Sequence, residues 1–269
     1  MHSSPDTVSV TRPPVVLLHG FLGTGEDWRV VRNGLSPRFD CHCPDLPGHG
    51  GNPRVSEGGM GSLEDAAHWL SGCLDDWQAP QCGLVGYSMG GRLALMTALR
   101  HPKRVSCLVL ESASPGLKTA EERTARLRHD AEVAARLDET AVSPDRLHAF
   151  LTWWYDQPLF ASLHDRGLVE ELVARRLRGV KHGSALAEAL MAFSTGAQPS
   201  LWEELPEHRI PTLLIVGERD RKYRFIAEEM AERCPAMAVE VFASCGHNVH
   251  LENPDGYTTA VRSFLCANA

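Results

Sequence analysis

A serine stands between two glycines in the pentapeptide Gly86-Tyr87-Ser88-Met89-Gly90. The apolar run CGLVGY leads into it and is typical of a buried strand, whereas GGRLALMTALR follows with the periodicity of a helix. A serine at such a strand-to-helix junction is the G-x-S-x-G nucleophile elbow, where the chain turns so sharply that glycine is needed on both sides. The pattern predicts a nucleophilic Ser88 raised above the end of a strand.

Strand and helix patterns alternate along the first half of the chain. Apolar runs at 15–20, 82–88 and 105–112 are typical of strands, and the stretches at 62–77 and 92–100 have helical periodicity. Such alternation is typical of parallel strands joined by crossover helices. Together with the elbow it predicts an α/β-hydrolase fold: a mostly parallel central sheet flanked by helices, with an inserted helical lid.

The strand pattern stops after Pro115 and resumes only with TLLIVG, after Pro206 and Pro211. The residues between are rich in Ala, Leu, Arg and Glu and have helical periodicity. We therefore expect residues 1–114 and 206–269 to form one α/β-hydrolase core and residues 115–205 to form the lid. Such a lid would cover the carboxyl ends of the strands, where open α/β sheets bind their ligands.

A serine hydroxyl needs an imidazole to take its proton, and the imidazole needs a carboxylate to orient it. In this fold the acid and then the histidine follow the serine along the chain. Asp220 comes just after the predicted strand TLLIVG, and His247 follows the last predicted strand, near VEVFAS. We predict a triad of Ser88, Asp220 and His247. The alternatives are Glu218 or Glu111 as the acid and His250, His19 or His49 as the base.

Two backbone N–H groups are candidates for an oxyanion hole. This fold takes one from the loop after its first long strand and one from the residue after the nucleophile. The segment HGFLG follows the strand VVLL, so we predict the N–H groups of Phe21 and Met89. The His19-Gly20 pair also ends the strand with a turn, and both interpretations can hold together.

Composition and charge argue against several classes of partner. Hydrophobic residues make up 43% of the 269 residues and charged residues 23%, as in globular proteins. A net charge of -7 argues against a nucleic-acid partner, which would draw on clustered Lys and Arg. No segment has the apolar length of a membrane span, and the start MHSSPDTVSV lacks the features of a secretory signal, so we expect no membrane insertion and a cytoplasmic location.

The eight cysteines have no zinc-type spacing, and we expect reduced thiols. Cys41, His42 and Cys43 are close in sequence, but strand alternation would put His42 on the face opposite the two thiols. We therefore predict no metal site.

Several longer motifs resemble one family, the 2-succinyl-6-hydroxy-2,4-cyclohexadiene-1-carboxylate synthases of menaquinone biosynthesis. The resemblance runs from about residue 15 to the C-terminus and rests on HGFLGTGEDW, DLPGHGGN, LVGYSMGGR, ESASPGL, EERTAR, WYDQPLF, VGERDRKYR and CGHNVHLENP. HGF, GYSMGG and GHN-x-H-x-EN-P occur in many α/β-hydrolases, whereas the arginine after the elbow, EERTAR and WYDQPLF are more specific. The resemblance implies a lyase that eliminates pyruvate, without a cofactor, from the small-molecule tricarboxylate 2-succinyl-5-enolpyruvyl-6-hydroxy-3-cyclohexene-1-carboxylate.

Arginines are the predicted ligands for these carboxylates, because the guanidinium fork binds a carboxylate with two hydrogen bonds. Arg92 lies four residues after Ser88 on the same helix face, although a helical arginine can equally pair with a surface acid. The resemblance adds Arg126 and Arg176, whose neighbours Arg123 and Arg175 remain alternatives. It also implies roles in substrate binding for Tyr87 and Lys222. Trp154 could line the pocket against an apolar ring, although an aromatic residue in a helical lid can instead seal the lid against the core. At position 223 the family's phenylalanine is a tyrosine here.

The implied mechanism uses Ser88 as a base that removes a ring proton, after His247 has taken the serine proton. Two rival functions use the same fold. One is a serine esterase or carbon–carbon bond hydrolase that passes through a covalent acyl-enzyme, since fold alone does not separate it from the lyase. The other is a ligand-binding receptor without turnover, against which the complete triad argues.

Overall fold

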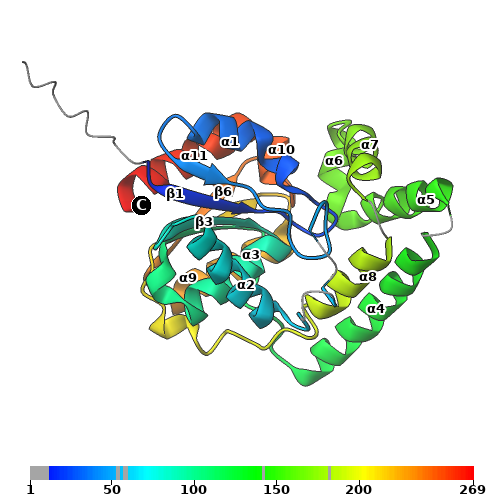
Figure 1. Ribbon diagram of the computed structural model, residues 1–269, viewed down its shortest axis with the longest axis horizontal. Coiled ribbons are helices and arrows are strands. Elements are labelled where there is room, and N and C mark those ends of the chain that lie inside the picture. Colours follow the sequence, from blue (N-terminus) through cyan, green and yellow to red (C-terminus); the bar gives the residue numbers. More distant parts are fainter. Residues whose placement is uncertain (1–11, 53–54, 57–59, 141–142, 181–182) are drawn as a thin grey trace, which may run out of the picture.

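The computed structural model describes residues 12–52, 55–56, 60–140, 143–180 and 183–269. A six-stranded sheet in the order β2-β1-β3-β4-β5-β6 forms its centre, and each neighbouring pair of strands is parallel (Figure 1). The strands are β1 (Pro14–Leu18), β2 (Asp40–His42), β3 (Cys82–Tyr87), β4 (Val105–Glu111), β5 (Thr212–Gly217) and β6 (Met237–Phe242). This topology is the mostly parallel sheet that the sequence predicts.

Alternating strand residues face two different layers of helices. Val16 and Leu18 of β1 pack toward α2 (Leu63–Asp76), α3 (Met89–Arg100) and α9 (Arg221–Arg233). Val15 and Leu17 pack on the opposite side, against α1 (Arg29–Leu35) and α11 (Pro254–Asn268). Both faces of the strands are therefore apolar, which explains why these runs are continuously hydrophobic in sequence.

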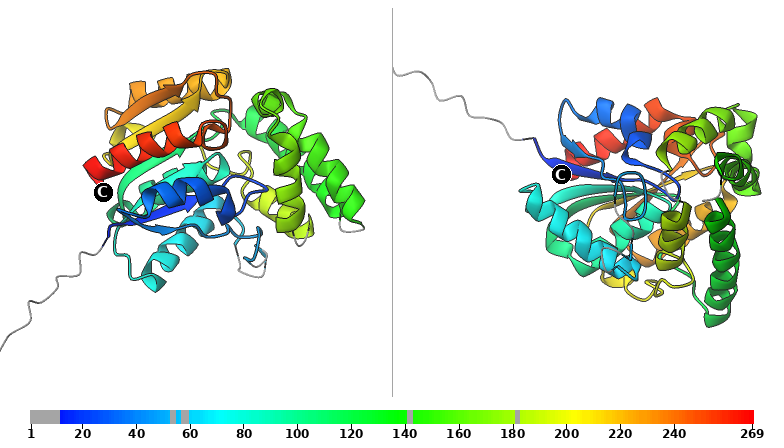
Figure 2. Two further views of the ribbon diagram at one scale, coloured as in Figure 1. Left: turned by 90° about the horizontal axis from the view of Figure 1, so that it is seen from above. Right: turned by 45° about the vertical axis from the view of Figure 1, so that its right-hand side comes forward.

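A group of helices separates β4 from β5 along the chain. They are α4 (Ala120–Glu139), α5 (Pro144–Tyr155), α6 (Ala161–Asp165), α7 (Val169–Gly179) and α8 (Gly183–Ala192). These helices gather at one end of the sheet (Figures 1 and 2). They bury an apolar cluster to which Leu137, Leu151 and Leu163 belong. We call α4–α8 the lid.

The two cysteines near β2 do not form a metal site with His42. The His42 ring stacks on Trp77 with a centroid distance of 4.4 Å, while Cys41 and Cys43 pack against the apolar cluster on the other face. Burial raises the pKa of the Cys41 thiol to about 11 and that of Cys43 to about 12. Across the part of the chain that the structure describes, no group of three His, Cys, Asp or Glu side chains is arranged to hold a metal ion.

Within the described residues, no helix has both the length and the apolar character needed to cross a membrane. The first ten residues, on which the expectation about a secretory signal rests, lie outside the described part of the chain.

Candidate active site

Ser88 lies at the junction of β3 and α3 in a backbone conformation that is rare outside glycine, with φ 51° and ψ -107°. The glycines beside it make the turn feasible. A Cβ at Gly86 would lie 2.4 Å from the carbonyl oxygen of Gly90, and one at Gly90 would lie 2.2 Å from that of Leu18. The sharp turn exposes the Ser88 hydroxyl at the carboxyl edge of the sheet, as the nucleophile elbow requires.

His247 contacts both of its predicted partners. Its Nε2 lies 3.2 Å from Ser88 Oγ, and its Nδ1 lies 2.6 Å from Oδ2 of Asp220. Asp220 is the N-cap of α9, and its Oδ1 accepts the backbone N–H of Tyr223 at 3.4 Å. Because His247 and Asp220 are both buried, the carboxylate holds the ring with Nδ1 protonated and leaves Nε2 to accept the serine proton.

The alternative acids have other partners. Glu218 accepts the backbone N–H of Ser244 at 2.9 Å and does not reach the His247 ring. Glu111, fully buried at the end of β4, accepts a hydrogen bond from Nδ1 of His250 at 2.8 Å. Glu111 and His250 therefore form a second carboxylate–imidazole pair, separate from Ser88.

The alternative base His19 directly follows β1, and His49 lies in the segment between β2 and α2. The Nε2 atom of His19 accepts the backbone N–H of Leu46 at 2.9 Å. Burial lowers the pKa of His49 to about 3, so its ring is neutral at physiological pH. Both rings pack inside the protein, and neither has a polar contact with Ser88 among the described residues.

The predicted oxyanion-hole groups flank the serine. Phe21 and Met89 both line the cavity that holds Ser88. Within the described residues, neither backbone N–H donates to a protein acceptor. Two free N–H groups beside a serine hydroxyl can stabilise a negative charge that develops on a substrate oxygen.

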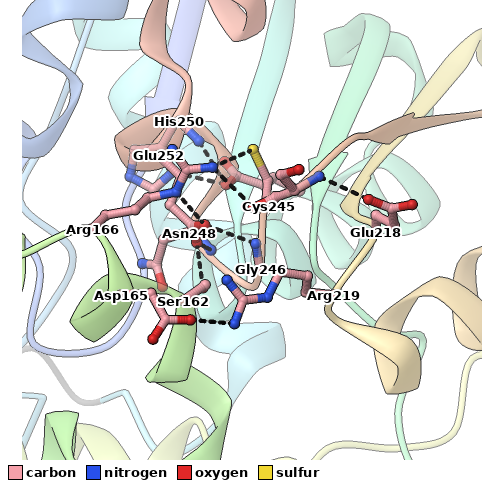
Figure 3. A network of polar contacts seen from close by, with 12 residues as sticks. Ser162, Asp165, Arg166, Glu218, Arg219, Cys245, Gly246, Asn248, His250 and Glu252 are labelled. Carbon is pink, nitrogen blue, oxygen red and sulfur yellow. Dashed lines mark hydrogen bonds and ion pairs between the residues drawn. The ribbon is translucent and has the colours of Figure 1, made fainter.

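A buried carboxylate supports the loop that carries His247. Glu252, on the short helix α10 (Val249–Glu252), accepts the backbone N–H of Gly246 at 2.8 Å and that of Asn248 at 3.3 Å. From the lid, Ser162 donates to the same carboxylate at 2.9 Å and Arg166 forms an ion pair with it at 3.3 Å (Figure 3). The backbone on both sides of His247 is thus fixed by one side chain.

A cavity of about 170 Å³ lies between the sheet edge and the lid. Of the residues predicted from the sequence, its wall includes Phe21, Tyr87, Ser88, Met89, Arg92, Arg126, Trp154, Arg176 and His247. Asp220 is behind His247, away from the wall. The structure does not bring Lys222 into the cavity, because its side chain is exposed with Nζ 5.6 Å from the centroid of the Tyr223 ring.

Arg92 enters the cavity from α3 and is held by neutral acceptors. Its Nη1 donates to Oε1 of Gln198 at 2.8 Å, and its Nη2 donates to the carbonyl oxygen of Phe193 at 2.7 Å. Burial, together with the positive charge of Arg126, lowers the pKa of Arg92 to about 10. The guanidinium therefore stays protonated at neutral pH.

Arg126 belongs to α4 and forms part of the cavity wall. Its Nε donates to Oδ1 of Asp130 at 2.8 Å, and Ser194 donates to the other oxygen of Asp130 at 2.6 Å. No protein acceptor among the described residues takes Nη1 or Nη2 of Arg126. This leaves the pair of nitrogens that a carboxylate binds with two hydrogen bonds.

Arg176 of α7 donates hydrogen bonds to two protein side chains, which the sequence did not suggest. Its Nη1 donates to Oδ1 of Asp27 at 2.7 Å, and its Nε donates to the hydroxyl of Tyr155 at 3.0 Å. Asp27 belongs to the 3₁₀ helix η1 (Gly25–Trp28) of the core, so the contact joins lid and core. Although burial alone would raise the pKa of Asp27, the Arg176 guanidinium lowers it to about 2.

The neighbouring arginines lie outside the cavity wall. Arg123 donates to the carbonyl oxygen of Leu117 at 3.3 Å, and Arg175 pairs with Glu171 at 2.9 Å. Within each pair of arginines that the sequence left open, it is Arg126 and Arg176 that reach the cavity.

Aromatic rings form the apolar part of the wall. Trp154 packs edge-on against Phe21 with ring centroids 5.4 Å apart, and Tyr87 packs edge-on against His247 at the same centroid distance. Tyr223, the residue that departs from the resembled family, also lines the cavity at 4.6 Å from the His247 ring. An apolar ring could pack among these aromatic side chains.

Sequence reasoning missed several residues at this site. Asp130 follows Arg126 by four residues on one helix, a spacing that could have identified it. Asp27, Gln198 and Ser194 carry no comparable signal, because their contacts join segments that are distant in sequence.

Comparison with known proteins identifies the family to which the chain belongs. The model of the alpha/beta hydrolase fold family matches residues 13–254. A 2-succinyl-6-hydroxy-2,4-cyclohexadiene-1-carboxylate synthase from Escherichia coli O7:K1 is 37% identical over 253 residues, which cover 94% of each chain.

Two solved structures have a similar fold. MenH from S. aureus superposes with a TM-score of 0.87 at 31% identity, over 96% of this chain and 94% of that one. A meta-cleavage product hydrolase from Pseudomonas fluorescens IP01 superposes with a TM-score of 0.75 at 25% identity, over 96% of this chain and 92% of the hydrolase.

Proposed function

Since this chain belongs to the α/β-hydrolase family and, within it, to the 2-succinyl-6-hydroxy-2,4-cyclohexadiene-1-carboxylate synthases, we propose that it eliminates pyruvate from 2-succinyl-5-enolpyruvyl-6-hydroxy-3-cyclohexene-1-carboxylate in menaquinone biosynthesis. The product is 2-succinyl-6-hydroxy-2,4-cyclohexadiene-1-carboxylate. The reaction breaks a carbon–oxygen bond, so the protein is a lyase on a hydrolase fold.

The triad supplies the base. His247 takes the proton of Ser88 through Nε2, and Asp220 stabilises the imidazolium that forms. The serine oxygen then removes the ring proton beside the succinyl ketone. The 3.2 Å and 2.6 Å contacts of His247 support this route, because they form a continuous path from the hydroxyl to the carboxylate.

Loss of the ring proton converts the succinyl ketone into an enolate. The N–H groups of Phe21 and Met89 stabilise its oxygen, since neither has a protein acceptor among the described residues. The electron pair then moves through the ring and breaks the bond to the enolpyruvyl oxygen. The leaving group departs as the enolate of pyruvate and takes up a proton to give pyruvate.

The arginines hold the three carboxylates of the substrate. Arg126 offers two free terminal nitrogens, and Arg92 and Arg176 add positive charge to the same wall. Fixing the substrate in this way brings the ring proton close to Ser88, which lowers the entropic part of the barrier. All groups in this scheme are side chains or backbone N–H groups of the chain.

One observation carries the proposal: the Ser88 hydroxyl opens into a cavity whose wall bears three guanidinium groups. Two of these groups are paired with Asp130 and Asp27, and Arg92 has no carboxylate partner among the described residues, so the wall keeps a net positive charge. A serine esterase or carbon–carbon bond hydrolase with the same triad has no evident use for this charge. The charge favours a substrate with several carboxylates, such as the enolpyruvyl compound.

The test is turnover of the enolpyruvyl substrate with a coupled measurement of pyruvate, followed by mass spectrometry of rapidly quenched enzyme. We expect pyruvate to form in a single phase, more slowly when the abstracted hydrogen is deuterium, and no added mass on the peptide that contains Ser88. A substrate-derived acyl group on that peptide, accumulating at the turnover rate, would restore the hydrolase mechanism.

A further inference from the structure

The three guanidinium groups of the cavity differ in how their charge is balanced. Arg126 has Asp130 beside it at 2.8 Å, and Arg176 has Asp27 at 2.7 Å. Arg92, which is only 9% exposed, forms no ion pair with any carboxylate of the described residues. Two of the three positive charges are therefore paired within the protein, and the third is not.

The acceptors that hold Arg92 are a carboxamide and a peptide carbonyl. We propose that Gln198 determines the specificity of the cavity for anionic substrates, because it fixes the Arg92 guanidinium without cancelling its charge. Gln198 is not part of the cavity wall, so it acts through Arg92 as a positioning residue. The proposal rests on the function proposed above.

The arrangement around Gln198 costs stability that a glutamate would restore. The Gln198 side chain is 2% exposed, and its Nε2 is buried without an acceptor among the described residues. A buried donor without an acceptor is unfavourable, and so is a buried arginine without an anion. A carboxylate at position 198 would remove the orphan donor and pair the arginine. Local departures of this kind are typical of functional sites, where stability is given up for activity.

The segment that follows α8 sets the surroundings of two arginines at once. The backbone N–H of Gln198 donates to the carbonyl oxygen of Ser194 at 3.0 Å, which closes a turn. The Ser194 hydroxyl meanwhile bonds to Asp130, the partner of Arg126. One short turn thus gives Arg92 a neutral acceptor and supports the carboxylate beside Arg126, so the net positive charge of this part of the wall is concentrated at Arg92.

Gln198→Glu is the decisive variant because it changes the charge and hardly changes the shape. We expect its KM for the enolpyruvyl substrate to rise about tenfold or more, with a smaller change in kcat, as the new carboxylate pairs with Arg92. The salt dependence of kcat/KM should weaken as well, because the cavity attracts the anion less strongly. The melting temperature should stay equal to that of the wild type or rise.

Two control variants separate charge from structure. Gln81→Glu makes the same chemical change on the exposed surface, where Gln81 donates to the carbonyl oxygen of Val105, and should leave KM unchanged. Gln198→Met removes the acceptor but keeps the cavity charge, and should raise KM less than the glutamate does. A Gln198→Glu protein with a KM within twofold of the wild type, or one that melts earlier or fails to fold, would contradict the proposal.

A measurement of substrate binding in an inactive variant tests the role of Gln198 separately from the proposed function. The affinity of the enolpyruvyl substrate can be titrated in a Ser88→Ala background, with and without Gln198→Glu. A loss of affinity of about tenfold supports the role of Gln198 even if the wild type releases no pyruvate. Pyruvate release by the wild type with unchanged affinity in the double variant overturns the role of Gln198 alone.

Discussion

Ser88 is held in its strained conformation by contacts on both sides of the turn. A non-glycine residue at φ 51° costs on the order of 1 kcal/mol or more. The Ser88 N–H bonds to the carbonyl oxygen of Glu111 on the neighbouring strand at 2.8 Å, and α3 begins at the next residue. The turn cannot relax without breaking this contact, so the hydroxyl stays within reach of His247.

The first prediction concerns the triad as a unit. Ser88→Ala, His247→Ala and Asp220→Asn should each lower kcat about a thousandfold or more while the protein stays folded. The losses should not add in the double variants, because each removes the same proton path. Steady-state pyruvate release, with circular dichroism as the check on folding, measures this. Near-wild-type kcat in Asp220→Asn together with a collapse in Glu218→Gln would identify Glu218 as the acid.

Some residues of the site could be predicted from sequence and others could not, for a physical reason. Ser88, Asp220 and His247 each follow a recognisable strand, and the edge of a parallel sheet brings strand ends together. Asp27 and Arg176 lie 149 positions apart, and no local pattern joins them. Only the folded chain shows that Arg176 is shared between the cavity and a buried carboxylate.

At the scale of elements, the loop between β6 and α10 determines where the imidazole lies. Glu252 accepts backbone N–H groups on either side of His247, and its side chain is completely buried. Glu218 accepts from the start of the same loop, at Ser244, but is exposed. The two carboxylates make similar hydrogen bonds in very different environments, so their contributions should differ.

We therefore predict that Glu252→Gln lowers kcat about tenfold with little change in KM, because the carboxamide cannot accept all the bonds that the carboxylate does and the loop shifts. The free energy of unfolding should fall by about 1–3 kcal/mol. Glu218→Gln is the matched control and should change both quantities much less. The proposed role would be wrong if Glu252→Gln lost stability yet kept the wild-type kcat.

The long elements were more predictable than the short ones. Apolar runs fixed the positions of β3, β4 and β5 because both faces of these strands are buried, and the structure confirms them. The three-residue strand β2 has too few residues for a clear pattern. Helical periodicity likewise predicted a helical region after Pro115 but not where α5, α6 and α7 begin, since those boundaries depend on packing against one another.

At the scale of the whole molecule, buried and exposed ion pairs both join the lid to the core. Arg176 of α7 reaches Asp27 in a buried contact, whereas Asp165 of α6 pairs with Arg219 at the surface. Breaking a buried ion pair leaves one charge without a partner and without water, which is strongly destabilising. A surface ion pair contributes about 1 kcal/mol or less to the free energy of unfolding. Of these two pairs, the buried one should therefore contribute more to the stability of the contact between lid and core.

The last prediction uses pH to separate these two pairs. Burial opposes ionisation of Asp27, but Arg176 outweighs it and lowers the pKa from 3.8 to about 2, with smaller contributions from His19 and His250. A carboxyl group whose pKa is lower in the folded chain stabilises the fold at pH values above its unfolded-state pKa. This stabilisation is lost as the pH falls from about 4 to about 2. This pKa shift corresponds to a contribution of roughly 2 kcal/mol to the free energy of unfolding at neutral pH.

Asp27→Asn should accordingly lower the free energy of unfolding at pH 7 by about 2–4 kcal/mol, because Arg176 loses its buried anion. The difference from the wild type should shrink at pH 3 and disappear only below about pH 2, the folded-state pKa, where Asp27 becomes protonated in both the folded and the unfolded chain. Asp165→Asn, the matched change at the exposed pair, should cost less than about 1 kcal/mol at pH 7. Urea unfolding at pH 7, 5 and 3 gives the free energy of unfolding of the wild type and of both variants. If the deficit in Asp27→Asn stayed constant across this pH range, Asp27 would stabilise the contact by shape or hydrogen bonding instead of charge.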